Sequence, residues 1–145
     1  MSTRAQVNIM NENHITPVAS LYIHGDGYPE GIGVELADIC KGIKIVDGIS
    51  PGKNDVANGM GCLAARIISI LKLDDMGIVM PGRVYLKNIE DDYDVTFKYE
   101  IVTQGIGKEV VIKIWSCGLN RLIFQGTPEE VINEFEDKIL EEINE

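Results

Sequence analysis

The sequence has few of the residues that build metal centres and disulfide frameworks. Its 145 residues include only two histidines and three cysteines, and the cysteines, Cys40, Cys62 and Cys117, lie far apart. An odd, scattered set of thiols argues against both a disulfide framework and a zinc cluster. We therefore predict reduced cysteines, no metal site and no cofactor.

The sequence also lacks long apolar runs. No stretch approaches the roughly 20 apolar residues that a membrane-spanning helix needs. No basic and apolar leader with a cleavage site stands before the first predicted strand. These observations predict a cytoplasmic protein that has no membrane partner.

Positive charge is scarce as well. The chain carries 13 lysines and arginines against 23 aspartates and glutamates, so its formal net charge is −10. Such a molecule repels the backbone of nucleic acids unless a local basic patch prevails, and no dense run of Lys and Arg occurs. We therefore do not expect direct nucleic-acid binding. Residues 129–145 hold eight of the acids against one base, Lys138, so the remaining chain is nearly balanced and compatible with a small anionic ligand.

Length and composition predict one globular domain over residues 1–145. The chain is 45% hydrophobic and 25% charged, which is typical of such domains. Near its start, residues 5–10 and 18–24 alternate between apolar and polar side chains, and a cluster of turn-forming residues separates them. This pattern predicts a β-hairpin.

Two helices are predicted after the hairpin. Apolar residues recur at helical spacing over 33–41 and again from position 54 or 55 to 72. The second of these helices contains Gly59 and Gly61 in its first half, and each glycine costs about 1 kcal/mol relative to alanine. We expect these two glycines to permit the close approach of a strand, a ligand or a second chain, and the last of these predicts a homo-oligomer.

The second half of the chain predicts four more strands and a final helix. The strands have a period of two, and they cover 83–89, 95–102, 110–115 and 121–124. Adjacency in sequence predicts that they form an antiparallel meander. The last helix begins with Thr127 as its N-cap, Pro128 at its first position and Glu130 completing a capping box. The order ββ-αα-ββββ-α predicts an α+β fold in which helices pack on one face of a mainly antiparallel sheet.

Aromatic residues make up only 6% of the chain. Four of them, Tyr85, Phe97, Tyr99 and Trp115, fall in predicted strands, and we expect most of these in the core. If one face of the sheet is exposed, an aromatic side chain on it can stack a base, because every base has a π-face.

The densest group of chemically active side chains follows the second predicted strand. His24, Asp26 and Tyr28 stand there within the stretch His-Gly-Asp-Gly-Tyr-Pro-Glu-Gly, residues 24–31. An imidazole at a strand end donates or accepts protons near neutral pH, and Asp26 can orient that ring or accept from a substrate hydroxyl. Tyr28 offers a hydroxyl and a stacking face. The alternative is a purely structural turn, which Asp-Gly and Tyr-Pro pairs favour.

Two further features suggest an anion site. Arg4 precedes the first predicted strand, where its guanidinium can bind a phosphate or carboxylate through two hydrogen bonds. It can equally pair with Asp26 or extend into solvent. Residues 48–55 resemble a phosphate-binding loop, but the spacing is one residue short and the required Ser or Thr is missing, which excludes a nucleoside triphosphatase of that type.

Three stretches of the chain resemble a family of small, uncharacterised proteins from bacteriophages, prophages and their hosts. These proteins open with Ser-Thr-Arg-Ala, as residues 2–5 do, and carry an H-x-D-G-Y-P signature after their second strand, as residues 24–29 do. The stretch Asn-Gly-x-Gly-Cys-x-Ala-Ala at 58–65 completes the resemblance. It implies a site at these positions and an accessory role in the host cytoplasm, including a role against host defence.

The leading functional hypothesis is a non-enzymatic, phage-type accessory protein that binds and sequesters a small anionic or nucleotide ligand. In this hypothesis Arg4 supplies charge and Tyr28 stacks on the ligand, while His24 and Asp26 orient it. Backbone amides of the glycine-rich turn complete the pocket. The predicted site consists of Arg4, His24, Asp26, Tyr28, Gly59 and Gly61.

Two alternatives belong to other functional classes. The first is a small hydrolase or phosphodiesterase that uses His24 as general acid and base, with Asp26 beside it and Arg4 stabilising the developing charge. The second is a protein–protein inhibitor whose acidic final helix mimics nucleic acid. A ligand that is released intact or altered distinguishes the first alternative from a binding protein.

Overall fold

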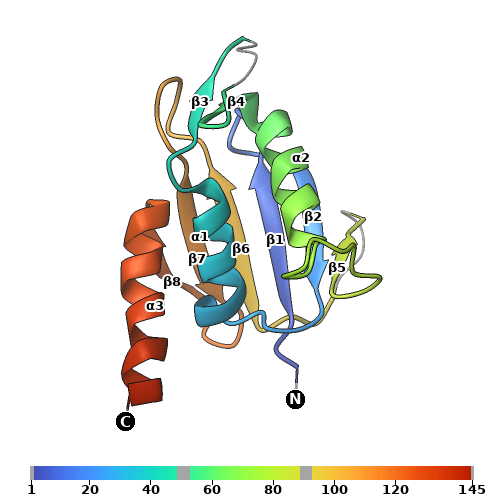
Figure 1. Ribbon diagram of the computed structural model, residues 1–145, viewed down its shortest axis with the longest axis vertical. Helices are drawn as coiled ribbons and strands as arrows, with labels where there is room; N and C mark the ends of the chain where they lie inside the picture. The colour runs from blue at the N-terminus through green and yellow to red at the C-terminus, as the bar shows by residue number, and fades with distance from the viewer. Residues whose placement is uncertain (1, 49–52, 89–92, 145) are drawn as a thin grey trace.

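The computed structural model describes residues 2–48, 53–88 and 93–144, and in the last helix it describes side chains only as far as residue 136. Within these residues a six-stranded sheet forms the centre of the molecule (Figure 1). Its strands are β1 (Ala5–Met10), β2 (Pro17–Ile23), β5 (Val84–Leu86), β6 (Phe97–Val102), β7 (Val111–Ser116) and β8 (Arg121–Gly126). Across the sheet they follow the order β5-β2-β1-β6-β7-β8.

The strand pairing is antiparallel except at the centre of the sheet. β1 and β2 form the predicted hairpin, with Val7 opposite Leu21. On its other side β1 pairs with β6 in parallel, which places Val7 opposite Tyr99. β6, β7 and β8 then continue as an antiparallel meander.

The predicted four-stranded meander is wrong at its first strand. β5 pairs with β2 at one edge of the sheet, and Tyr85 lies opposite Tyr22. The side of β6 that the prediction assigned to β5 is occupied by β1. Adjacency in sequence is only a tendency, and here the longer β1 displaces the three-residue β5 from that position.

The α-helices cover one face of this sheet, as Figure 1 shows. The fold is therefore α+β with a mainly antiparallel sheet, as predicted. The helices are α1 (Val34–Cys40), α2 (Gly59–Leu71) and α3 (Pro128–Asn144), and one turn of π-helix, η1 (Pro29–Gly33), leads into α1.

A second, two-stranded sheet was not predicted. β3 (Lys44–Val46) and β4 (Val56–Asn58) pair in parallel, and each is only three residues long. Because β4 occupies the residues before Gly59, α2 begins there and not at position 54 or 55. Strands of three residues are too short to show a period, so the sequence gives no signal for them.

The start of α3 matches the predicted capping box. The Thr127 N–H donates to Glu130 Oε1 at 3.1 Å, and the Glu130 N–H donates to Thr127 Oγ1 at 3.4 Å. The Thr127 N–H and the Thr127 hydroxyl, which donates to Glu130 Oε1 at 3.0 Å, lower the pKa of the Glu130 carboxyl, since they stabilise its charged form. Two helix-terminal amides are thus satisfied locally.

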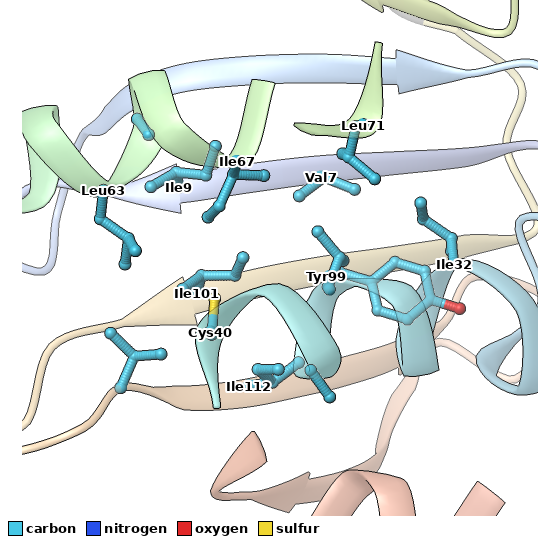
Figure 2. Close-up of a cluster of buried hydrophobic side chains, with 14 of the residues drawn as sticks. Val7, Ile9, Ile32, Cys40, Leu63, Ile67, Leu71, Tyr99, Ile101 and Ile112 are labelled. Carbon is cyan, nitrogen blue, oxygen red and sulfur yellow. The ribbon is translucent and has the colours of Figure 1, made fainter. Parts of the chain in front are cut away.

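The hydrophobic core lies between the sheet and the helices (Figure 2). Val7 and Ile9 of β1 point into it, as do Tyr99 and Ile101 of β6, and the helices contribute residues such as Ile67. Each fully buried aliphatic side chain contributes about 2 kcal/mol of burial energy before conformational entropy is subtracted. The side chains between these residues in the strands point to the opposite face.

Among the described helices, none combines the length and the apolar character that crossing a bilayer requires. α3 is the longest, with 17 residues, and its described portion is strongly acidic. Its apolar side chains Val131 and Phe135 pack into the core.

Candidate functional site

The candidate site lies on the face of the large sheet that is opposite the helices. We call this surface the open face. One row of cross-strand neighbours crosses it from edge to edge. The row consists of Tyr85, Tyr22, Gln6, Lys98, Trp115 and Leu122. Because side chains alternate along a strand, these residues point away from the core that their neighbours fill.

Two predicted site residues extend the open face at one end. His24 follows Tyr22 by two positions, and Arg4 precedes Gln6 by two positions, so each shares the orientation of that neighbour. The backbone joins the Arg4 segment to the residue before β6, because the N–H of Thr96 donates to the carbonyl oxygen of Arg4 at 2.9 Å. Arg4, His24 and Thr96 are all exposed at this end.

Arg4 and His24 line the same cavity. It has a volume of about 350 Å³, and Ser2, Asp94 and Thr96 complete its lining. The cavity therefore presents a guanidinium, an imidazole, two hydroxyls and one carboxylate. The convergence of Arg4 and His24 was expected from the sequence, whereas Asp94 and Thr96 come from a segment about 70 residues further along that no motif marked.

Two tyrosines extend the chemistry of this cavity. A hydrogen bond of 2.8 Å joins the Tyr22 hydroxyl to Nδ1 of His24. The rings of Tyr22 and Tyr93 lie 4.7 Å apart between centroids with an interplanar angle of 36°. Lys87 Nζ lies 5.6 Å from the centroid of the Tyr93 ring. An aromatic platform with a cation above it thus adjoins the imidazole.

A second cavity of about 330 Å³ continues from the first. Tyr93, Lys98 and Cys117 contribute to its lining, and Asp94 lines both cavities. The two cavities therefore adjoin at Asp94, with Arg4 in one and Lys98 in the other, and we call them together the open-face groove. Lys98 and Tyr93 were not predicted as site residues. The period of two in the strand nevertheless places Lys98 on the face opposite Tyr99.

Asp26 and Tyr28 form a separate pair. The Tyr28 hydroxyl donates to Asp26 Oδ1 at 3.3 Å, and the negative charge of Asp26 is the main cause that raises the pKa of Tyr28. The prediction that Asp26 orients the His24 ring is therefore wrong, because Tyr22 is the partner of that imidazole. The described residues also contain no ion pair between Arg4 and Asp26.

Arg83 lies close to this pair and was not predicted. Its guanidinium donates to both carboxylate oxygens of Glu35, at 2.8 and 3.2 Å. Asp26 and Arg83 both have positive φ angles, 56° and 70°, which side-chain-bearing residues rarely adopt. The His24 N–H donates to the Arg83 carbonyl oxygen at 2.8 Å, so the backbones of the two segments are tied together.

The glycines of the 24–31 stretch serve the turn. A Cβ at Gly27 would lie 2.8 Å from the Thr3 carbonyl oxygen and 2.8 Å from Ala5 Cβ. A Cβ at Gly31 would lie 2.5 Å from the Asp26 carbonyl oxygen, so backbone approaches too closely there for any side chain. The structural explanation therefore holds for the glycines, while the side chain of His24 stays exposed to solvent.

Gly59 and Gly61 do not belong to this site. They lie near the other end of β1, a strand whose six residues span about 20 Å. A protein carboxylate already occupies the start of α2, since the Met60 N–H donates to Glu12 Oε1 at 2.7 Å. Gly59 is required by its φ of +78°, and a Cβ at Gly61 would meet only an ordinary contact with Val18 at 4.0 Å. The predicted pocket that joins these glycines to Arg4 and His24 is thus not formed.

No family model, curated protein or solved structure matches the chain. Function is therefore inferred from the chemistry of the site itself. Within the described ranges, no three His, Cys, Asp or Glu side chains gather closely enough to hold a metal ion.

Proposed function

We propose that the protein binds and sequesters a small anionic ligand of nucleotide type at the end of the open face. The observation that carries this proposal is the shared cavity of Arg4 and His24, which also presents the hydroxyls of Ser2 and Thr96. A guanidinium binds a phosphate through two parallel hydrogen bonds, and hydroxyls add further donors. This combination suits a phosphate group better than it suits an apolar ligand.

The neighbouring aromatic platform supports a ligand that also carries a base. The side chain of Tyr93 is 40% exposed, and its ring lies against that of Tyr22. Stacking of a base on such a ring contributes about 1–3 kcal/mol. Asp94 lies between the two cavities, where its carboxylate can accept an N–H from the edge of a base.

Mixed charge in the groove favours a small ligand over a polymer. Asp94 repels a run of phosphates, and the net charge of −10 repels an extended nucleic acid.

Binding without turnover is proposed because Asp26, the predicted carboxylate partner of His24, forms its hydrogen bond with Tyr28. The resemblance of the first 65 residues to phage and prophage proteins suggests that the ligand is a signalling nucleotide of a host defence system.

The ligand class is tested by exchange and release. The protein is incubated with a panel of linear and cyclic nucleotides and with inorganic phosphate, freed of unbound ligand and then heated. Mass spectrometry of the released material is expected to show an intact nucleotide. If the released nucleotide is chemically altered, and the His24→Ala variant releases it unaltered, the hydrolase alternative would replace this proposal. If the protein retains no member of the panel, the proposal is wrong.

The position of the site is tested by a matched pair of arginine variants. Arg4→Ala is expected to weaken nucleotide binding at least tenfold, because a charge-assisted hydrogen-bond pair is lost. Arg121→Ala serves as the control, since Arg121 is an exposed arginine at the start of the edge strand β8. Isothermal titration that finds equal losses in both variants would place the ligand elsewhere.

A further inference from the structure

A groove runs between α1 and α2 on the helical side of the molecule, opposite the nucleotide site proposed above. Two cavities of about 550 and 590 Å³ form it, and they share Asp38, Ile39 and Ile70 in their linings. Figure 1 shows α1 between α3 and α2, so the groove faces outward between the second pair. A groove between two helices is a setting in which an amphipathic helix of a partner can dock.

Apolar side chains line this groove and its border. Ile39, Ile70 and Leu73 lie in its lining, and Ile70 is 43% exposed. The loop that follows α2 adds Met76 and Val79, which are 83% and 65% exposed. Large apolar residues gathered in one exposed area mark an interaction surface more often than scattered ones do, because water contact there is unfavourable.

Acidic side chains surround the apolar residues. Asp38 lies on α1, while Asp74 and Asp75 follow α2. Glu35 is neutralised by its two hydrogen bonds to Arg83, and the cavity that holds Asp74 and Asp75 has no other lysine or arginine in its lining. The bases of the other cavity, Lys41 and Arg66, lie at the far end of the groove from Asp74 and Asp75. Asp38 is exposed; its partial burial raises the pKa of its carboxyl, and the nearby Lys41 opposes that shift.

The loop that carries two of these acids is held in shape before any partner arrives. Asp74 Oδ1 accepts hydrogen bonds from the N–H groups of Met76 and Ile78, at 2.8 and 2.9 Å. The Ile78 carbonyl oxygen in turn accepts from the Asp74 N–H at 2.9 Å. A preformed border lowers the entropy that docking costs.

We propose that this groove docks an amphipathic helix of another protein, which presents an apolar stripe and lysines or arginines toward Asp38, Asp74 and Asp75. Charge complementarity selects this occupant: the carboxylates attract a basic segment, and the apolar floor excludes a purely polar one. A second copy of this chain is a poor occupant. Its described amphipathic helix α3 carries Glu129, Glu130, Glu134 and Glu136, which would meet like charges.

A designed probe tests the proposal directly. It is a fluorescein-labelled peptide of about 18 residues, five helical turns, with leucines on one face and lysines on the other. Its partner peptide has the same leucines but glutamates in place of the lysines. Fluorescence anisotropy is expected to show binding of the lysine peptide at least tenfold tighter than that of the glutamate peptide. Equal affinities would overturn the proposal.

Paired variants separate docking from general attraction to an acidic protein. The combined Asp38→Asn and Asp75→Asn variant is expected to weaken lysine-peptide binding about tenfold. The combined Glu129→Gln and Glu136→Gln variant changes net charge equally on exposed positions of α3, outside the groove, and is expected to change affinity less than twofold. Equal losses in the two variants would mean that the peptide senses net charge alone, which overturns the proposal.

A third variant tests the apolar floor. Ile70→Ser, at a side chain that is exposed in the free protein, is expected to weaken peptide binding about fivefold while leaving thermal stability almost unchanged. Arg4→Ala is expected to leave peptide binding unchanged, so failure of the nucleotide site and failure of the groove are distinguishable. Unchanged affinity in Ile70→Ser would contradict docking in the groove.

Discussion

Gly27 holds the turn after β2 against the segment that carries Arg4. Its N–H donates to the Thr3 carbonyl oxygen at 2.9 Å, and its carbonyl oxygen accepts from the buried Tyr99 hydroxyl at 2.7 Å. The turn after β2 is therefore held against both the amino-terminal segment and the core. Because the missing side chain allows backbone to meet backbone there, Gly27 supports the position that the pairing of Ala5 with Ile23 gives to the two candidate ligand-binding residues, although it does not touch the cavity.

Replacing this glycine tests that explanation. Gly27→Ala is expected to lower the free energy of unfolding by about 2 kcal/mol, since the added Cβ would lie 2.8 Å from two atoms that cannot easily move. Gly118→Ala is the control, because a Cβ there meets nothing within 4 Å. Urea denaturation measures both variants. Equal stabilities for the two variants would show that the turn adjusts without cost.

At the scale of the element, local signals and long-range pairing differ in how well they can be predicted. The capping residues of α3 and the alternation of β1 and β2 are local, so these elements were predicted within a residue or two. The position of β5 depends on which edge of the sheet is free to pair, and the sequence of residues 83–89 does not specify that edge. β3 and β4 failed for a different reason, because three residues do not establish a period.

The strand order predicts which backbone amides exchange their hydrogen with solvent most slowly. β1 and β6 have a strand on both sides and a buried face, whereas β5 is a three-residue edge strand. Amides of Val7 and Tyr99 are therefore expected to exchange with deuterium at least a hundredfold more slowly than that of Tyr85. Exchange followed by NMR measures these rates. If Tyr85 is as protected as Val7, the sheet does not end at β5.

On the scale of the whole molecule, the candidate site also combines residues with a local sequence signal and residues that only long-range pairing brings in. Arg4 and His24 could be found from the sequence because each stands beside a recognisable strand. Asp94 and Thr96 reach them only through the parallel pairing of β1 with β6, which joins segments about 90 residues apart. The glycines at the start of α2 were assigned to the wrong end, because the direction of β1 relative to α2 is not readable from spacing.

The stability of the molecule is expected to fall in alkaline solution because of Cys40. Burial raises the pKa of its thiol from 9.0 to about 12. Above pH 9 the unfolded chain loses this proton while the folded protein keeps it, so the free energy of unfolding decreases as pH rises toward 12. Between pH 8 and pH 10 this contribution falls by about 1.4 kcal/mol.

Urea denaturation at several pH values isolates that contribution. Cys40→Ala is expected to make the decline between pH 8 and pH 10 smaller by about 1.4 kcal/mol. Cys62→Ala is the matched control, because Cys62 is exposed on α2 and its replacement is expected to leave the slope unchanged. Identical slopes in all three proteins would assign the alkaline decline to other groups.

The parallel pair at the middle of the sheet has a consequence for biosynthesis. Ile9 finds its neighbour only when Ile101 has left the ribosome, more than 90 codons later. Throughout that interval the emerging chain carries a hairpin with one side bare, ready to join any extended polypeptide nearby. Truncated translation products that stop before β6 should therefore depend on chaperones or precipitate, whereas the completed chain closes that edge upon itself.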